Sequence, residues 1–386
     1  MLLLYLHSMR FGIVIIGLLA LLGLGKWSNS SLGDPPKVSF EEKMRGVCWV
    51  AGDSVIQANF DDAVRANVRW ISQTPFAWQE GHDNPMIGYD NSKSWWGERD
   101  EGVLHTTALA HERGLKVMLK PHIWLTRADG KWRSDIKMNS EDHWDTWFQQ
   151  YESMILHYAR LAQKGRMEAL CIGTELLHPS TIYPDKWRSI IMKIRSVYDG
   201  QLTYAANFHD EFEMIEFWSD LDFIGVQAYF PLTSKLAPGK NELVRSWRKH
   251  SKTLEEIAVK YQRPVIFTEV GYKNCTDAAI EPWIWPDQMS SKSVSISDEF
   301  QADCYDAMFE VMWSKKWFAG LFIWKWFPGT YALDYDGFQE RMEERRKEWS
   351  QRRNIELGPR VQFTPQRKKA EEVMASWFGN DNLVEK

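Results

Sequence analysis

The chain has 386 residues, of which 26% are charged, with a formal net charge of −5 and a pI near 6.1. Because acidic and basic residues nearly balance, the chain has no excess of basic residues that would bind nucleic acid, and no nucleic-acid partner is expected. Hydrophobic residues make up 44% of the chain, which is typical of a globular protein and excludes a disordered one. The length allows one large domain or two of ordinary size.

The first 35 residues are expected to be a signal peptide or a membrane anchor, followed by a linker. Arg10 precedes an apolar run, Phe11 to Leu24, which has the length of a signal-peptide core and is short for a membrane span. Membrane attachment through residues 9–25 is the alternative, because Leu2 to Leu6 lengthen the run. Either interpretation predicts an extracytoplasmic protein, secreted or anchored, with its folded domain in residues 36–380.

One pattern, a short β-rich run followed by an amphipathic helical stretch, recurs eight times along the rest of the chain. The runs are apolar on both faces, as buried parallel strands are. They are Arg45–Val50, Val68–Gln73, Lys116–Lys120, Ala169–Thr174, Leu202–Ala206, Phe223–Gln227, Val265–Thr268 and Gly320–Trp324. Intervening stretches such as Asp142–Gln163 and Asn241–Tyr261 predict helices. Strict alternation of eight strands with helices predicts an α/β fold, a single-domain (β/α)8 or TIM barrel.

A doubly wound sheet is the alternative architecture. It would usually show a glycine-rich phosphate-binding loop after its first strand, and the sequence has none.

Long loops are predicted after strands two, seven and eight. They are Ala77–Arg99, Asn274–Ser297, and a segment that runs to about Phe363 before a final helix, Pro365–Phe378. The first two loops are rich in tryptophan, of which the chain has 21 residues. Loops that follow barrel strands build the functional face, so these would wall a cleft. Flat rings with one polar edge suit sugars, which are apolar on their faces and polar at their rims.

The cysteines give little information on function. Cys48 and Cys171 fall inside apolar strands and are expected to be buried thiols. Cys275 and Cys304 are the pair that an oxidising compartment would allow to form a disulfide.

Two carboxylates stand out by their position. Glu175 ends the fourth predicted strand and Glu269 ends the seventh, and a glutamate at the end of an apolar strand is costly unless it is paired or functional. Two such groups on non-adjacent strands would face each other across the mouth of the barrel. Glycoside hydrolysis needs that arrangement, with one carboxyl to protonate the leaving oxygen and one to attack the anomeric carbon. The structural alternative is that each glutamate is held in an ion pair, with Lys120 or an arginine.

At this point the sequence resembles glycoside hydrolase family 113, a family of retaining (β/α)8-barrel glycosidases that are chiefly endo-β-1,4-mannanases. The resemblance covers most of residues 44–378 and rests on seven strings in the expected order. They are RGVCW, LKPHIWL, CIGTEL, QAYFP, FTEVGY, FIWKWF and FTPQRKKAEEV.

The resemblance implies that Glu175 is the acid/base and Glu269 the nucleophile, with Tyr229 donating a hydrogen bond to Glu269. It implies that Trp324 is a platform beneath the sugar at the cleavage point. The remaining candidates for substrate binding are Lys120, His122 and Trp124, which alternate along the end of strand three, together with Asn207 and Trp49. For Tyr229 and His122, a structural role in the core is the competing interpretation.

Two departures from the wider pattern concern the substrate. Thr174 stands where most members of the larger clan have an asparagine that binds the sugar 2-hydroxyl, a departure that family 113 shares. The charged segment Gln339–Arg360 is longer than the family pattern and would shorten the polymer that fits, if it caps the cleft.

The function predicted from sequence is therefore hydrolysis of β-1,4-mannosidic bonds by double displacement, with a mannan-type oligo- or polysaccharide as partner. No cofactor and no metal site are expected, because no metal-ligand or phosphate-binding motif occurs, and a monomer is expected. Two alternatives stay open. One is a different β-glycanase or β-glycosidase on the same barrel, and the other is a non-catalytic, membrane-attached barrel that binds glycans.

Overall fold

The computed structural model describes residues 33–39, 41–286, 295–328 and 361–380, with 340, 343–345, 347–348 and 350–352. The chain divides into two units at Gly33, and the second, residues 34–386, contains the barrel. The predicted signal or anchor segment, residues 9–25, lies outside the described residues. Parts of the loops after the seventh and eighth barrel strands lie outside them as well. No described helix is long and apolar enough to cross a membrane.

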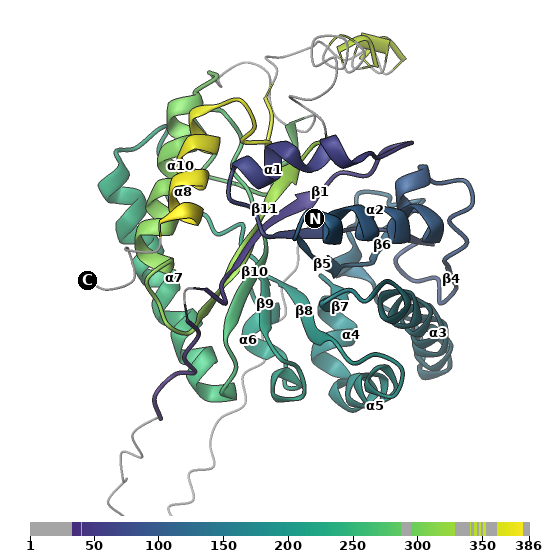
Figure 1. Ribbon diagram of the computed structural model, residues 1–386. Coiled ribbons are helices and arrows are strands. Elements are labelled where there is room, and N and C mark those ends of the chain that lie inside the picture. The colour runs from purple at the N-terminus through teal and green to yellow at the C-terminus, as the bar shows by residue number, and fades with distance from the viewer. Residues whose placement is uncertain are drawn as a thin grey trace, which may run out of the picture. The chain divides into compact units, whose positions relative to one another are not determined.

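In the described part of the chain, eight parallel strands close into a barrel with helices between them (Figure 1). The strands follow one another around the barrel in chain order. They are β1 (Met44–Trp49), β2 (Trp70–Gln73), β5 (Lys116–Leu119), β7 (Ala169–Thr174), β8 (Gln201–Asn207), β9 (Ile224–Gln227), β10 (Val265–Val270) and β11 (Phe318–Trp326). The predicted TIM barrel is therefore confirmed, and each of the eight predicted runs contributes one strand.

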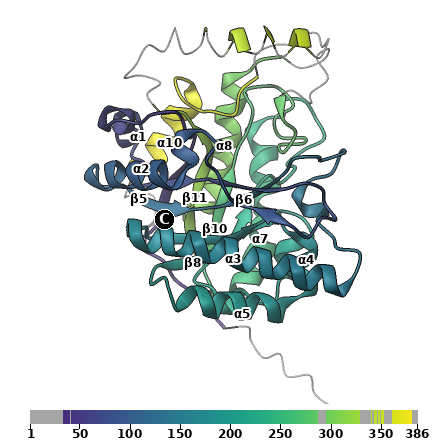
Figure 2. The ribbon, with the colours of Figure 1, turned by 90° about the vertical axis from the view of Figure 1, so that its right-hand side faces the viewer.

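The helices form the outer layer around the barrel (Figures 1 and 2). They are α1 (Asp61–Arg65), α2 (Asp100–Glu112), α3 (Glu141–Gly165), α4 (Leu177–Ile182), α5 (Pro184–Arg195), α6 (Glu211–Met214), α7 (Lys240–Tyr261), α8 (Asp298–Met312) and α10 (Lys369–Gly379). Two of these helices, α3 and α8, begin at serine caps: Ser140 accepts a hydrogen bond from the amide of His143, and Ser297 from that of Phe300.

The last helix starts four residues later than the sequence predicts. The predicted start was Pro365, but Arg367 has a φ of 58°, a left-handed conformation that a helix cannot contain. The chain therefore turns first, and α10 begins at Lys369 and packs beside α8 (Figure 1).

A small second sheet continues two barrel strands beyond the rim. Strand β3 (Phe76–Gln79) follows β2, and β6 (His122–Leu125) follows β5; β3 and β6 pair in parallel, with β4 (Ile87–Gly88) at the edge of β3. Both breaks contain a proline, Pro75 and Pro121, which lacks the N–H that a strand ladder uses. The string LKPHIWL, which reads as the end of one strand, thus spans two strands in different sheets.

Side chains on the barrel strands divide into two buried groups. One group, which includes Val47, Ile71 and Val117, packs against the helices. The alternate residues of the same strands, among them Cys48, Met118 and Cys171, fill the barrel. Cys48 and Cys171 are buried thiols, as predicted. Cys275 and Cys304 are also buried and free, so the structure shows no disulfide between them.

Candidate active site

Glu269 is a buried carboxylate near the C-terminal end of β10. Its side chain is 6% exposed. Oε1 accepts a hydrogen bond from the ammonium of Lys120, and Oε2 accepts one from the hydroxyl of Tyr229 at 2.8 Å. A carboxylate buried this deeply is costly unless it is paired. These two donors pair it and fix its orientation.

Both donors keep their protons at neutral pH. Burial alone would lower the pKa of Lys120, but the charge and hydrogen bond of Glu269, together with the nearby thiols Cys48 and Cys171, outweigh burial and the pKa is raised. Burial, reinforced by Glu269, raises the pKa of Tyr229 well above its usual value of 10. Tyr229 is therefore a hydroxyl donor, and Lys120 a permanent cation beneath the carboxylate.

Glu175 directly follows β7 and has a strained backbone. Its φ is 54°, in the left-handed region that residues other than glycine seldom occupy. Its amide donates a hydrogen bond to the carbonyl of Ala205, at 2.8 Å. Oε2 accepts a hydrogen bond from Nε1 of Trp132 at 2.8 Å, and Nε of Arg133 lies 3.8 Å from the same oxygen. Strain of this kind persists only where the surroundings hold it, and it concentrates at functional sites.

A buried chain of side chains connects the two carboxyls. Nη1 of Arg133 lies 2.8 Å from Nδ1 of His122, and Nε2 of His122 lies 3.9 Å from Oε1 of Glu269. Arginine can only donate, so Nδ1 of His122 accepts and its proton is on Nε2. Burial, with Arg133 and Lys120 nearby, lowers the pKa of His122 well below 6.5, so the ring is neutral. Among the described residues Nε2 has no hydrogen-bond partner, which leaves a donor for a ligand oxygen.

The surroundings of the two carboxyls differ in charge. Burial raises the pKa of Glu175; Glu269 raises it further, while Arg133 and the hydrogen bond from Trp132 oppose the rise. Glu269 is instead in contact with the cation of Lys120. Glu175 is therefore suited to carry a proton while Glu269 carries a charge, which is the division of roles that an acid and a nucleophile need.

The ion pairs named as the structural alternative are present, so pairing alone does not decide between the interpretations. Lys120 pairs with Glu269, and Arg133 lies near Glu175. The convergence of the two glutamates from separate strands, and the strained backbone at one of them, are features that a simple buried ion pair does not need.

Aromatic side chains of the second sheet are linked to Glu175 through Trp132, which donates to it. Trp124 on β6 is 41% exposed, and its ring meets that of Trp132 edge-on at 6.0 Å. Phe76 packs edge-on against Trp124 at 5.8 Å, and Trp78 is paired with Trp124 across the sheet. These four rings, Phe76, Trp78, Trp124 and Trp132, form what we call the aromatic wall.

Trp324 on β11 lies near Lys120 of the Lys120–Glu269 pair. The ammonium of Lys120 is 6.0 Å from the centre of the Trp324 ring, and Trp285 meets that ring edge-on at 6.1 Å. The peptide bond from Trp324 to Lys325 is cis. The structure thus brings together Glu175, Glu269, Lys120, His122, Tyr229, Trp324 and Trp124 from the residues singled out in the sequence.

The two remaining candidates are buried, and the contacts of their side chains are with other protein groups. Trp49 is 4% exposed and stacks on Phe60 with ring centres 4.5 Å apart, within the core between barrel and helices. Asn207 is 7% exposed, and its amide nitrogen donates to Oε2 of Glu211 at 2.8 Å. Substrate contact by Trp49 or Asn207 stays a prediction.

Sequence reasoning missed Trp132, Arg133 and Glu211. Trp132 and Arg133 stand in a short polar segment, at the start of the 3-10 helix Arg133–Asp135, that no motif marks. Glu211 falls in the acidic string HDEFE, which reads as a solvated helix start. The only available signal was indirect, because a buried acid at the end of an apolar strand needs a donor from elsewhere in the chain.

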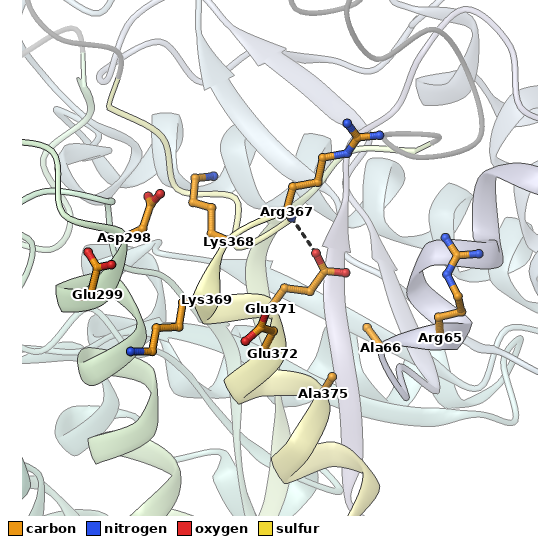
Figure 3. A pocket seen from close by; sticks show the side chains of 10 residues that line it. All are labelled: Arg65, Ala66, Asp298, Glu299, Arg367, Lys368, Lys369, Glu371, Glu372 and Ala375. Carbon is orange, nitrogen blue, oxygen red and sulfur yellow. Dashed lines mark hydrogen bonds between the residues drawn. The ribbon is translucent and has the colours of Figure 1, made fainter.

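A separate hollow of about 1020 Å³ lies between α1, α8 and α10 on the outer helical layer (Figure 3). It is lined by mixed charges, and the amide of Arg367 donates to Glu371 at 2.6 Å within it. It includes neither catalytic candidate. Among the described residues, no cluster of His, Cys, Asp or Glu has the arrangement of a metal site.

Comparisons with known proteins agree with the barrel fold. No curated protein sequence matches the chain. A β-mannanase from Alicyclobacillus acidocaldarius, solved in complex with ManMIm, is similar with a TM-score of 0.68 and 27% identity, over 88% of this chain and 99% of that one. A β-1,4-mannanase structure is similar in fold, with a TM-score of 0.67 and 24% identity over 87% and 98% of the two chains. The model of Glycoside Hydrolase Family 113 matches residues 52–341, and the chain belongs to this family of glycoside hydrolases.

Proposed function

We propose that the enzyme cleaves β-1,4-mannosidic bonds of mannan or manno-oligosaccharides with retention of anomeric configuration. The observation that carries this proposal is the opposite environment of the two carboxyls: burial raises the pKa of Glu175, while Glu269 is held by Lys120 and Tyr229. Retaining hydrolysis uses such a pair. The mannosidic substrate is supported by the similar solved structures, which are β-mannanases.

In the first step a carboxylate oxygen of Glu269 attacks the anomeric carbon, and Glu175 gives its proton to the departing glycosidic oxygen. This step forms a covalent glycosyl-enzyme and leaves Glu175 as a carboxylate. In the second step Glu175 takes a proton from water, whose oxygen attacks the same carbon and releases Glu269. The Nε2–H of His122, 3.9 Å from Glu269, is placed to donate to a hydroxyl of the sugar at the cleavage point.

The aromatic wall and Trp324 supply ring faces for neighbouring sugars. Trp124 exposes 41% of its surface beside Trp132, and Trp132 itself contacts Glu175. A sugar stacked there would place its glycosidic oxygen near the acid. Stacking on a ring depends little on the configuration of the sugar hydroxyls, whereas hydrogen-bond donors distinguish one configuration from another. Specificity for mannose would therefore come from polar groups such as His122.

The test is to incubate the purified chain with β-1,4-manno-oligosaccharides and to follow the anomeric configuration of the first product by NMR. A β-product that is lost in Glu269→Gln supports both the substrate and the mechanism. An initial α-product would contradict retention. Turnover of β-glucans or xylans but not of mannans would support the proposed roles of the two carboxyls and contradict the proposed substrate. Binding of any of these glycans without turnover would favour a non-catalytic barrel that binds glycans.

We also propose that the enzyme acts outside the cytoplasm, on the strength of the apolar run Phe11–Leu24 alone. Fractionation of expressing cells, with and without residues 1–35, tests this. Equal retention of both forms in the cytoplasm would contradict it.

A further inference from the structure

Glu211, at the start of α6, is a fully buried carboxylate outside the pair already described. In the described part of the chain its hydrogen-bond donors are all neutral. Oε1 accepts from the hydroxyls of Tyr204 and, at 2.8 Å, Ser180. Oε2 accepts from the amide and the side-chain nitrogen of Asn207, both at 2.8 Å. Burying a carboxylate without a cation beside it costs free energy of folding, so a role beyond packing is expected for Glu211.

The donors of Glu211 lead toward the acid of the proposed mechanism. The hydroxyl of Tyr204 donates to Glu211 and also accepts a hydrogen bond from the amide of Leu176, at 2.8 Å. Leu176 directly follows Glu175, the residue with the left-handed backbone. Tyr204 therefore joins the buried carboxylate to the strained turn that presents Glu175.

The direction of these hydrogen bonds depends on Glu211 being an acceptor. A tyrosine has one hydroxyl proton, and Tyr204 gives it to Glu211, which turns the oxygen lone pairs toward Leu176. A glutamine at position 211 that satisfies both donors of Asn207 must present its NH2 group to Tyr204. The proton of Tyr204 would then lose Glu211 as its acceptor, and the hydroxyl would have to turn toward another group, away from the orientation that receives the amide of Leu176.

The electrostatic surroundings also couple the two acids. Burial raises the pKa of Glu211 to about 7, with Glu175 adding to the rise and the hydrogen bonds from Asn207, Tyr204 and Ser180 opposing it. The titratable groups that face Glu211 are Tyr204 from β8 and Glu175 after β7. His178 on α4 instead interacts with Lys137 and Asp135, and β9 contributes no titratable residue.

We propose that Glu211 is a positioning residue for the general acid: through Tyr204 it fixes the turn that presents Glu175, and through Asn207 it fixes the adjoining end of β8. This inference rests on the acid role proposed for Glu175. Glu211 itself does not touch the substrate.

The first test compares Glu211→Gln with Glu213→Gln, an exposed acid on the same short helix. For a manno-oligosaccharide, whose leaving group needs a proton, we expect kcat/KM of Glu211→Gln to fall about 10- to 100-fold. For a 2,4-dinitrophenyl β-mannobioside, whose leaving group needs none, we expect a change within about threefold. Glu213→Gln should behave as the unaltered enzyme does. Equal losses on the two substrates would mean that Glu211 only supports the fold, and would overturn the inference.

The second test separates the two hydroxyls that donate to Oε1 of Glu211. Tyr204→Phe removes the link to Leu176 and keeps the ring, whereas Ser180→Ala removes a hydrogen bond to the same oxygen and leaves that link in place. Only Tyr204→Phe should reproduce the substrate-dependent loss. Loss in both variants, in proportion to their fall in Tm, would contradict positioning.

A measurement that does not depend on catalysis tests this inference separately from the proposed function. Carboxyl-labelled NMR titration locates the midpoint of Glu175, assigned by comparison with Glu175→Gln. Glu211→Gln should move that midpoint, because a turn that is no longer fixed changes how Glu175 lies against Arg133 and the Trp132 donor, both of which act on its pKa. If the midpoint shifts but the enzyme does not cleave mannosides, the proposed substrate is contradicted and the positioning role of Glu211 is supported. An unshifted midpoint would refute the inference even if mannosides are cleaved.

Discussion

Arg133 donates a hydrogen bond to Nδ1 of His122 at 2.8 Å, and this contact fixes the tautomer of His122. Because arginine has no acceptor, His122 is held with its proton on Nε2, 3.9 Å from Glu269. The same guanidinium lies 3.8 Å from Glu175, so one buried cation acts on the proposed acid and on the donor beside the proposed nucleophile.

Replacing Arg133 with glutamine should therefore move the pH profile. Arg133 lowers the pKa of Glu175, so without it the acid holds its proton to higher pH and the alkaline limb of kcat/KM moves up. We expect a loss of roughly tenfold in kcat/KM at the optimum, because the His122 donor is no longer fixed. The control is Arg127→Gln, an exposed arginine near Glu80. A limb that moves to lower pH would contradict this assignment.

Tyr229→Phe should lower kcat about 10- to 100-fold with little change in KM, because a hydrogen bond to a charged group is worth about 1.5–3 kcal/mol. Steady-state kinetics on a manno-oligosaccharide measure it. Tyr198→Phe is the matched control, since its hydroxyl donates at the same 2.8 Å, but to the carbonyl of Met167 before β7. The control should lose about 1 kcal/mol of stability and no activity. Similar kinetics for both variants would argue against a role of Tyr229 at the nucleophile.

Glu211 should make the folded state less stable as pH rises from about 5 to 7. Its pKa is raised from 4.5 to about 7, so the folded protein binds a proton there that the unfolded chain has released. This contribution is complete below pH 4.5 and is lost as pH passes 7; at 1.36 kcal/mol per pH unit it amounts to about 3 kcal/mol. Urea unfolding at pH 5 and pH 7 should show a smaller difference for Glu211→Gln than for the unaltered protein. An unchanged difference would contradict the prediction.

Trp124→Ala should raise KM for a manno-oligosaccharide about tenfold, equivalent to ~1.4 kcal/mol, and leave kcat within about threefold. The ring is partly exposed and touches no carboxyl of the pair directly, so it is expected to contribute binding rather than chemistry. Met192→Ala, an exposed apolar residue on α5, is the control. A fall in kcat with unchanged KM would instead place Trp124 among the groups that act in the transition state.

The barrel was predictable because its strands are buried on both faces and separated by amphipathic helices. Ala169–Thr174 was predicted to the residue, since a run of apolar and small residues ends at a charged one. The second sheet was not predicted. Its strands are only two to four residues long, and Pro121 interrupts a string that is otherwise continuous in composition.

The convergence of Glu175, Glu269 and Tyr229 was predictable because each lies at or near the end of an apolar strand. Trp132 and Arg133 were not, because a residue in an irregular segment has no periodicity to set its direction. Trp49 lies within a barrel strand, where alternation fixes the face to which each side chain points, and its ring stacks on Phe60 in the core.

The two prolines that end β2 and β5 have a consequence for how the enzyme can change. Because β3 and β6 resume in register after Pro75 and Pro121, three rings of the aromatic wall, Phe76, Trp78 and Trp124, stand on strands that continue those of the barrel. Their placement is therefore set by strand pairing and not by the conformation of a loop. A change of length in the turn between β3 and β4 would leave the pairing of β3 with β6 in place.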